Sequence, residues 1–175
     1  FVTLLAFSAL HAVRIPLTHK PGDEKYVVCV SSQSGCAMGC TFCATGSLGF
    51  RRDLEAWEIV DQVLTVRRDS GFPVRGVVFM GMGEPMLNYD NVMRAAHIMT
   101  EPSGLAISSK AITISTAGVI PGIRRFTQER RPYRLVVSLS GAASGKREKL
   151  IPAEKKYPLK DLIASLREYH DSAKE

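Results

Sequence analysis

Short apolar runs alternate with amphipathic stretches along most of the chain, and this alternation limits the folds that the chain can adopt. Each apolar run has the length of a strand, and each amphipathic stretch has the length of a helix. The expected strands span residues 26–31, 74–80, 110–116 and 134–139, and the expected helices span residues 53–69, 89–101, 121–128 and 158–174. Strands that alternate with helices form a parallel sheet with the helices outside. The sequence therefore predicts an α/β fold with about four parallel β–α units, arranged as an incomplete barrel or as an open doubly wound sheet.

The first two expected helices carry clear sequence signals. Asp53 is the expected N-cap of the first helix, because Glu55 and Glu58 follow it in the turns where the helix dipole favours acidic side chains. One face of each helix is apolar, as a helix packed on a sheet requires. The expected apolar residues are Trp57, Val60, Val63 and Leu64 on the first helix, and Val92, Ala95, Ala96 and Met99 on the second.

Loops rich in glycine or polar residues follow all four expected strands. These loops span residues 32–49, 81–88, 116–122 and 140–145. In open parallel sheets, ligands bind at the carboxyl ends of the strands. The sequence therefore predicts a binding site that is built from these four loops.

Length and charge allow one domain and an anionic partner. The chain has 175 residues, of which 45% are hydrophobic, and a formal net charge of +6. A chain of this length buries a substantial core, and excess positive charge suits nucleic acid. Residues 1–25 are expected to form an N-terminal segment that leads into a core at residues 26–175. No apolar run reaches the roughly 18 residues of a membrane-spanning helix, so we expect no membrane partner.

Four cysteines crowd into a single stretch, residues 29–43. A disulfide scaffold would spread its cysteines more evenly. Crowding instead indicates a metal or cluster site in a reducing compartment, so the chain is expected to be cytoplasmic. Within this stretch, Cys36, Cys40 and Cys43 have the spacing C-x3-C-x2-C. Thiolates at such spacings bind iron–sulfur clusters or zinc.

The spacing favours a [4Fe–4S] cluster over zinc. Three thiolates hold three irons of a cubane and leave the fourth iron open to an exogenous ligand, which S-adenosylmethionine (SAM) can supply. A structural zinc site usually has two close pairs of ligands, and here Cys29 would have to serve as a distant fourth ligand. Both alternatives stay open from spacing alone. Phe42, beside the last cysteine, can either cover such a cluster or pack in the core.

Four segments of the chain resemble the RlmN/Cfr family of radical SAM RNA methyltransferases. They are residues 29–50, which hold the cysteines, residues 81–85 (G-M-G-E-P), residues 114–121 (I-S-T-A-G-V-I-P) and residues 150–158 (L-I-P-A-E-K-K-Y-P). The segments fall in the family's order, and the resemblance covers about residues 12–172. It implies the fold of radical SAM enzymes, an incomplete (βα) barrel.

The resemblance implies an enzyme that methylates adenine in 23S ribosomal RNA, at C2 or at C8 with C2 favoured, and transfer RNA is a further candidate substrate. Its implied cofactors are a [4Fe–4S] cluster and SAM, and its implied reductant is an electron donor such as flavodoxin. In the family, one SAM methylates a carrier cysteine of the protein, and a radical made from a second SAM activates that methyl group. A second cysteine then helps to release the product, and the two cysteines end as a disulfide.

The resemblance also assigns residues to the site. Cys36, Cys40 and Cys43 are the implied cluster ligands. Cys29 is the implied second cysteine of the relay, although it could also be an ordinary buried strand residue. The implied SAM contacts are Gly83, Glu84, Ser115, Ser138, Leu139 and Ser140. Without this role, Glu84 would be a solvated acid in a loop.

Two further positions carry alternatives of the same kind. The family usually has a proton-accepting Glu in a strand that ends V-x-I-P, and residues 10–16 (L-H-A-V-R-I-P) place His11 there. A histidine accepts a proton near neutral pH, so His11 is a candidate catalytic residue, although a lone histidine is more often structural. Ser115 could also be a hydroxyl that caps the turn after its strand.

The sequence departs from the family in several ways. No cysteine follows Cys43, and Ser140, Gly141 and Ala142 stand where the family usually has His-Ala-Pro. The family's N-terminal RNA-binding domain and its last barrel strands have no counterpart either. We therefore expect a fragment or a shortened paralogue that does not complete methylation alone. The alternatives are a radical SAM enzyme with another acceptor and a zinc-bearing RNA-binding module.

Overall fold

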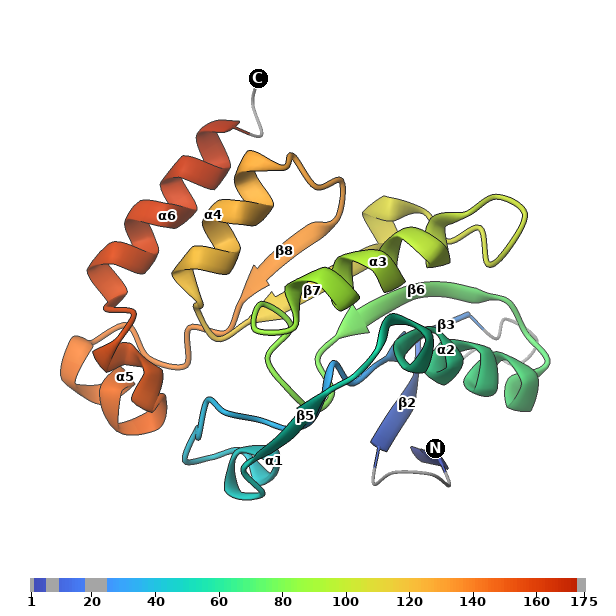
Figure 1. Ribbon diagram of the computed structural model, residues 1–175, viewed down its shortest axis with the longest axis horizontal. Coiled ribbons are helices and arrows are strands. Elements are labelled where there is room, and N and C mark those ends of the chain that lie inside the picture. Colours follow the sequence, from blue (N-terminus) through green and yellow to red (C-terminus); the bar gives the residue numbers. More distant parts are fainter. Residues whose placement is uncertain (1, 6–9, 18–24, 173–175) are drawn as a thin grey trace.

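A six-stranded sheet forms the centre of the computed structural model, which describes residues 2–5, 10–17 and 25–172. The strand order is β1-β2-β3-β6-β7-β8 (Figure 1). The four neighbouring parallel strands are β3 (Tyr26–Cys29), β6 (Val74–Phe79), β7 (Ile112–Thr116) and β8 (Arg134–Val137). The strands β1 (Val2–Leu5) and β2 (Leu10–Pro16) extend the sheet antiparallel at the β3 edge. The predicted α/β fold with about four parallel β–α units is confirmed.

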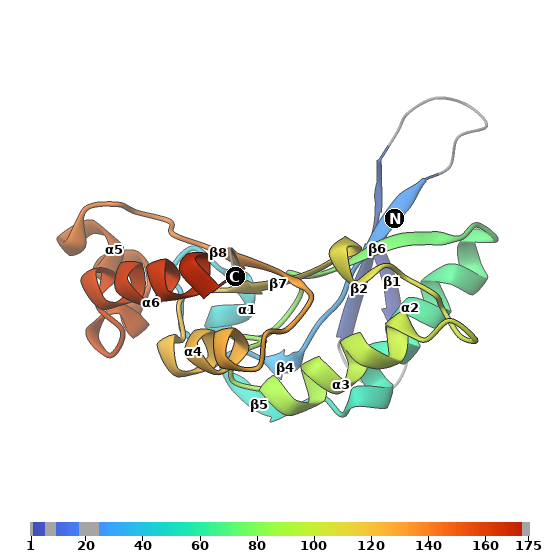
Figure 2. The ribbon, with the colours of Figure 1, turned by 90° about the horizontal axis from the view of Figure 1, so that it is seen from above.

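One long helix follows each parallel strand, as the sequence predicts. The helices are α2 (Ala56–Ser70), α3 (Tyr89–Thr100), α4 (Ile120–Gln128) and α6 (Leu159–Ser172). Figure 2 shows α3 and α4 on the same side of the parallel strands. This arrangement is that of an incomplete barrel, with the helices outside.

The connections carry short elements that the sequence patterns do not predict. After β3, the strands β4 (Gln33–Gly35) and β5 (Phe50–Asp53) pair antiparallel on either side of the cysteines and of α1 (Ala44–Ser47). After β8 come α5 (Ser144–Leu150) and the 3-10 turn η2 (Pro152–Lys155). A second 3-10 turn, η1 (Ser109–Ala111), precedes β7. Most of these elements therefore lie on the carboxyl side of the parallel strands, where the binding site is expected.

Apolar side chains between the strands and the helices form the core. Fully buried examples are Val28, Val77, Ile112 and Ile114 from the strands, and Ile59, Val63, Val92 and Met99 from the helices. Burying one such side chain contributes about 1.5–3 kcal/mol. The predicted inner face of α3 is confirmed, because all four of its expected apolar residues are fully buried.

The start of α2 differs from the prediction. Its N-cap is Glu55 rather than Asp53, and Glu55 and Glu58 form a reciprocal capping box. Asp53 instead ends β5, where its carboxylate accepts a hydrogen bond from Gln33 Nε2 at 2.7 Å. The strand pair therefore uses Asp53, and the helix is capped two residues later.

The predicted buried face of α2 is also partly wrong. Trp57 is 68% exposed and Leu64 is 39% exposed. The buried face carries Ala56, Ile59, Gln62, Val63 and Val66. Because the buried face includes the polar residue Gln62, a pattern of apolar residues alone does not identify it. That pattern instead favours the exposed apolar residues Trp57 and Leu64.

The N-terminal strands belong to the same sheet as the core. β2 pairs with β3, which places Val13 opposite Cys29. His11 lies in β2, but its side chain is outside the described residues, so its proposed role stays a prediction. Within the described ranges, no helix combines the length and the apolar character that crossing a membrane requires.

Candidate functional site

A cavity of about 260 Å³ lies at the carboxyl ends of β6, β7 and β8. The arrowheads of these strands point toward the side of the molecule where α1 and α5 lie (Figure 1). The cavity lining includes the three predicted cluster ligands and four of the predicted SAM contacts, namely Cys36, Cys40, Cys43, Gly83, Glu84, Ser115 and Ser138. Residues from four separate connections thus meet at the edge of the sheet where the sequence predicts a binding site.

The backbone fixes the course of the cluster loop, residues 36–43. At its start, Cys36 N donates a hydrogen bond to Gly49 O at 3.0 Å. Gly35 has φ +79°, and a Cβ atom at this position would lie 1.9 Å from Gly49 O. Glycine is therefore required at position 35. The backbone hydrogen bond holds the start of the loop without using a thiol. All three thiols of the loop are unpaired, and all three cysteines line the cavity.

The three thiols of the cluster loop are partly buried and unpaired with one another. Burial raises the pKa of Cys36 and of Cys40, and the nearby Glu84 carboxylate raises both further. A thiol ligand loses its proton when metal binds. The raised pKa values favour neutral thiols at Cys36 and Cys40, so a ligand role would require both thiols to give up their protons.

Three thiolates without a fourth ligand fit a [4Fe–4S] cluster that has one open iron. The zinc alternative needs Cys29 as its fourth ligand. Cys29 is 8% exposed within β3 and is not among the described residues that line the cavity. The donor set therefore fits a cluster better than zinc.

Cys29 lies beside the cavity rather than in its lining. Its thiol accepts a hydrogen bond from the Met80 backbone, and burial raises the pKa of that thiol. Met80 itself lines the cavity and is 50% exposed. Phe42 also lines the cavity and is 59% exposed, so it is not a core residue and is free to cover a bound cluster.

Glu84 is 2% exposed, which excludes a solvated loop acid. Its Oε1 accepts a hydrogen bond from Met86 N at 3.1 Å, and its Oε2 accepts one from Ala117 N at 2.8 Å. The Thr116 hydroxyl provides a third donor. A carboxylate has about four acceptor positions, so one position remains for a ligand. Burial raises the pKa of Glu84, and the three donors oppose that shift.

Gly83 allows the Glu84 loop to approach the segment after β3. Its φ is +100°, and a Cβ atom there would lie 2.6 Å from Gln33 Cβ. Gln33 Oε1 accepts a hydrogen bond from Glu84 N at 2.8 Å. A larger residue at position 83 would therefore separate the loop from Gln33 and displace Glu84.

The predicted contacts on β7 and β8 are only partly brought together. The hydroxyl oxygens of Ser115 and Ser138 are 3.5 Å apart across the two parallel strands. Leu139 and Ser140 follow Ser138 directly, but neither is among the described residues of the lining. Ser140 has φ +53°, in the left-handed region that few residues other than glycine adopt. Of these three consecutive residues, Ser138 is therefore the one that the described lining contains.

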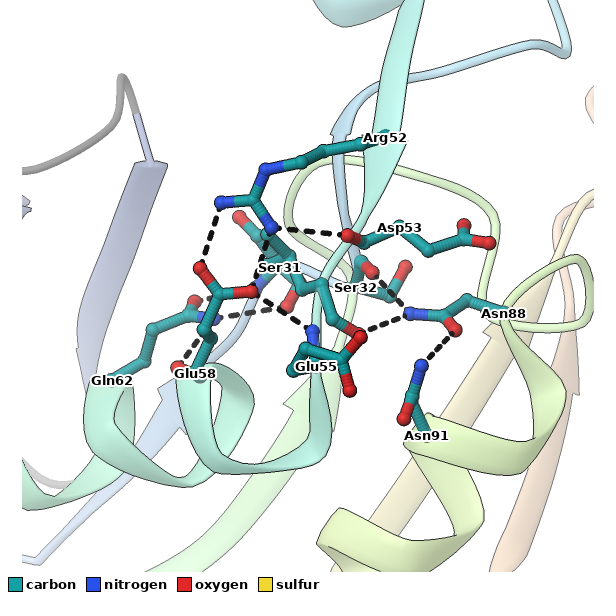
Figure 3. A network of polar contacts seen from close by, with 10 residues as sticks. Ser31, Ser32, Arg52, Asp53, Glu55, Glu58, Gln62, Asn88 and Asn91 are labelled. Atoms are coloured by element: carbon teal, nitrogen blue, oxygen red, sulfur yellow. Dashed lines mark hydrogen bonds and ion pairs between the residues drawn. The ribbon is translucent and has the colours of Figure 1, made fainter.

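Buried amides hold the segment after β3 against α2 and α3 (Figure 3). Gln62 Oε1 accepts from Ser31 N at 2.8 Å, and Gln62 Nε2 donates to Ser31 O at 3.0 Å. Asn88 Nδ2 donates to Ser32 O at 2.8 Å and to Leu54 O at 2.7 Å. Both amides are almost fully buried. They fix the chain just before it enters the cluster loop.

On the other side of the cavity, a buried ion pair joins three segments. Arg147 is 1% exposed, and its guanidinium pairs with Glu154, which is 5% exposed. Arg147 Nε donates to Leu139 O at 3.1 Å, and Arg147 Nη2 donates to Ala117 O at 2.6 Å. Glu154 also accepts a hydrogen bond from Leu159 N at 2.7 Å. The pair therefore connects α5 to the chain that follows β7, β8 and η2.

Sequence reasoning missed three of these residues, Gln62, Asn88 and Arg147. Gln62 carries a usable signal, because a polar residue between Ile59 and Val66 on an apolar face indicates a buried, hydrogen-bonded group. Arg147 carries no such signal, because it lies among charged residues that are typical of a solvated helix. Two of its partners are backbone carbonyls, and since every residue has one, the sequence does not show which carbonyls Arg147 contacts.

The sequence matches the Radical SAM superfamily over residues 30–174. A probable RNA methyltransferase of Myxococcus xanthus is 56% identical to this chain, over 95% of the chain and 45% of the relative. The dual-specificity RNA methyltransferase RlmN of Syntrophobacter fumaroxidans is 52% identical, over 85% of this chain and 44% of its own length. The chain thus spans a little under half the length of these relatives. The predicted resemblance to RlmN-type proteins is confirmed.

A solved structure agrees with the sequence matches. The crystal structure of a radical SAM methyltransferase from Sphaerobacter thermophilus resembles this fold with a TM-score of 0.86 and 37% sequence identity. The match covers 96% of this chain and 49% of the other chain. Fold, cysteine spacing and sequence similarity therefore agree, and the chain belongs to the Radical SAM superfamily.

Proposed function

We propose that this chain provides the cluster and SAM site of an RlmN-type RNA methyltransferase. The proposed reaction is methylation of adenine at C2, rather than at C8, in 23S ribosomal RNA, with transfer RNA as a further candidate substrate. The observation that carries this proposal is the cavity in which Cys36, Cys40 and Cys43 lie together with Glu84. The names of the similar proteins support RNA as the substrate.

The proposed cofactors are a [4Fe–4S] cluster, held by the three cysteines of the cluster loop, and SAM. When bound, the cluster supplies the electron that cleaves the sulfonium bond of SAM. Glu84 is proposed to accept a hydrogen bond from the SAM amino group, since its three protein donors leave one acceptor position. Ser115 and Ser138 offer hydroxyl groups to the same ligand, and Gly83 keeps the Glu84 loop in place.

Cys29 is proposed to release the methylated product. Its thiol gives up a proton, and the resulting thiolate attacks the sulfur of a carrier cysteine, which is not one of the four cysteines here. An S–S bond forms while the bond between that sulfur and the methylene carbon on adenine breaks. The electron pair of the broken bond stays with the carbon, which takes a proton and becomes the methyl group. His11 stays the proton acceptor predicted from the sequence.

The proposal includes a cytoplasmic site of action and an electron donor such as flavodoxin. A net charge of +6 supports an RNA partner. Thiol ligands stay reduced in the cytoplasm, where RNA and low-potential electron donors also occur.

Anaerobic reconstitution tests the cofactors first. We expect about four irons and four sulfides per chain, loss of both in Cys36→Ala, and 5′-deoxyadenosine formation when SAM and dithionite are added. Stoichiometric zinc without iron would overturn the proposal and support a zinc-bearing RNA-binding module.

A chimera tests the reaction on RNA. This chain replaces the matching part of the Myxococcus xanthus relative, which supplies its own remaining residues. We expect 2-methyladenosine in 23S ribosomal RNA by nucleoside mass spectrometry, and a trapped protein–RNA adduct when the chimera carries Cys29→Ser. The 175-residue chain alone should form neither product. A product of 8-methyladenosine would overturn the C2 assignment, and 5′-deoxyadenosine without methylated adenine would indicate another acceptor.

A further inference from the structure

Arg147 lies where the connections that build the cavity converge. Its guanidinium donates to Ala117 O in the β7 loop, residues 117–119, and to Leu139 O in the β8 loop, residues 138–143. The side chain itself starts from α5. One buried group therefore holds two loops and a helix together.

The helix α5 is also bonded to the cluster loop. Thr41 N donates to Leu150 O at 3.0 Å, and Thr41 Oγ1 donates to Lys149 O at 3.3 Å. Ile151, directly after α5, lines the cavity. The C-terminal end of α5 thus holds the cluster loop, while Arg147 near its middle holds the β7 and β8 loops.

A single residue, Ala117, connects Arg147 to Glu84. Ala117 O accepts a hydrogen bond from Arg147 at 2.6 Å, while Ala117 N donates to Glu84 Oε2 at 2.8 Å. The next residue, Gly118, has φ +112°, and a Cβ atom there would lie 2.9 Å from Leu162 Cδ2 and 3.2 Å from Arg147 Nη2. The β7 loop is therefore tightly enclosed, and a displaced guanidinium would move the N–H group that orients Glu84.

We propose that Arg147 is a positioning residue that fixes the cluster loop relative to the β7 and β8 loops. The inference rests on the proposed SAM site and adds a residue that lies behind that site. A guanidinium suits this task, because its five N–H donors lie in one rigid plane and reach acceptors in several directions. Glu154 balances the buried charge.

The substitution Arg147→Lys separates positioning from charge balance. A lysine keeps a positive charge beside Glu154, but its compact ammonium group on a flexible stem does not hold both loop carbonyls in a fixed geometry. We expect the cluster-loaded Arg147→Lys chain to be folded, with a cooperative unfolding transition. We expect it to bind SAM about 10–100-fold more weakly than wild type. Equilibrium dialysis with labelled SAM measures this affinity without any turnover.

Arg124→Met is the matched control. Arg124 also pairs with a glutamate, Glu168, at 3.2 Å, but both side chains are about half exposed and lie on α4 and α6. This variant removes an arginine from an ion pair without touching the cavity. Its SAM affinity should equal that of wild type.

The electron paramagnetic resonance spectrum of the reduced cluster gives a second readout. If SAM binds to the cluster, added SAM should change this spectrum in wild type, and Arg147→Lys should need correspondingly more SAM for the same change. The double variant Arg147→Met/Glu154→Leu removes the charges together, so it covers the case in which a single variant misfolds. This double variant should be folded and should also bind SAM more weakly than wild type.

Three results would overturn the inference. Wild-type SAM affinity in both Arg147→Lys and the double variant would leave Arg147 a purely structural residue. A loss of binding that matches the unfolded fraction of each variant would lead to the same conclusion. A wild-type chain that holds the cluster but does not bind SAM would refute the proposed SAM site and, with it, the role of Arg147.

Discussion

The two sides of the cavity are held by different chemistry. On the cluster-loop side, the neutral amides of Gln62 and Asn88 bond to the backbone of residues 31–32 (Figure 3). On the other side, the ion pair of Arg147 and Glu154 bonds to the β7 and β8 loops. Leaving a buried partner of a neutral hydrogen bond unpaired costs about 1–3 kcal/mol, whereas breaking a buried ion pair costs about 3–5 kcal/mol. The second side should therefore tolerate substitution less.

Geometry explains why the two sides differ. A carboxamide offers both a donor and an acceptor, so Gln62 satisfies the N–H and the C=O of Ser31 as a neighbouring strand would. Arg147 reaches carbonyls of two separate loops through Nε and Nη2, two donors that stand apart in the guanidinium plane, whereas both donors of an amide sit on a single nitrogen. A charge is thus introduced where three segments converge, and Glu154 is required to balance it.

Separating the ion pair should have the largest effect. Arg147→Met leaves Glu154 as a buried charge without its partner and should lower the free energy of unfolding by about 3–5 kcal/mol. Urea denaturation followed by circular dichroism measures the loss. The double variant Arg147→Met/Glu154→Leu should recover much of it, because no unpaired charge stays buried. A double variant that loses the sum of both single effects would show that the two charges do not act as a pair.

Removing an amide from the cluster-loop side should have a smaller effect. Asn88→Leu leaves the Leu54 carbonyl without its side-chain donor and leaves Ser32 O with only the N–H of Leu54, so it should lower the free energy of unfolding by about 1–3 kcal/mol. Asn91→Ala is the control, since Asn91 donates only to the Asn88 side chain at 3.0 Å in a partly buried position. If Asn88→Leu were as damaging as Arg147→Met in the same urea series, the proposed contrast between the two sides would be wrong.

The sequence predicts the fold and the cavity lining better than the groups that hold the lining in place. Strands and helices follow from local periodicity, and Glu84 is recognisable because its motif is continuous along the chain. Gln62 and Arg147 act on backbone atoms far away in the sequence, and any residue type provides such atoms. The prediction that Trp57 is buried is wrong because residue type alone does not show which side of the helix faces the sheet. Ile59 and Val63 occupy the core, and Trp57 is exposed.

An exposed charge on the cluster-loop side sharpens the comparison. Arg52 donates to both carboxylate oxygens of Glu58 at 2.7 Å, and the Arg52 side chain is 49% exposed. Arg52→Ala should therefore lower the free energy of unfolding by only about 0.2–1 kcal/mol. The hydrogen bond from Arg52 lowers the pKa of Glu58 below 4.5. This stabilisation is thus present above pH 4.5 and is lost as the pH falls through the lowered pKa. A difference between wild type and Arg52→Ala that grows in acid would contradict this assignment.

The smallest effect is expected at an exposed ion pair between α3 and α4, whose residues are not among the described residues of the cavity lining. Arg125 Nη2 lies 2.5 Å from Asp90 Oδ1, and the Asp90 side chain is 80% exposed. The Arg125 hydrogen bond lowers the pKa of Asp90, but solvent screens the pair, so Asp90→Asn should change the free energy of unfolding by about 0.2 kcal/mol.

Salt distinguishes this exposed pair from the buried one. In about 1 M sodium chloride the Debye length falls to about 3 Å, and the effect of Asp90→Asn should disappear. The loss caused by Arg147→Met should persist in the same urea titration, because buried charges are screened much less. If both losses faded together with salt, water would have access to Arg147 and Glu154, and their ion pair could not be what fixes the β7 and β8 loops.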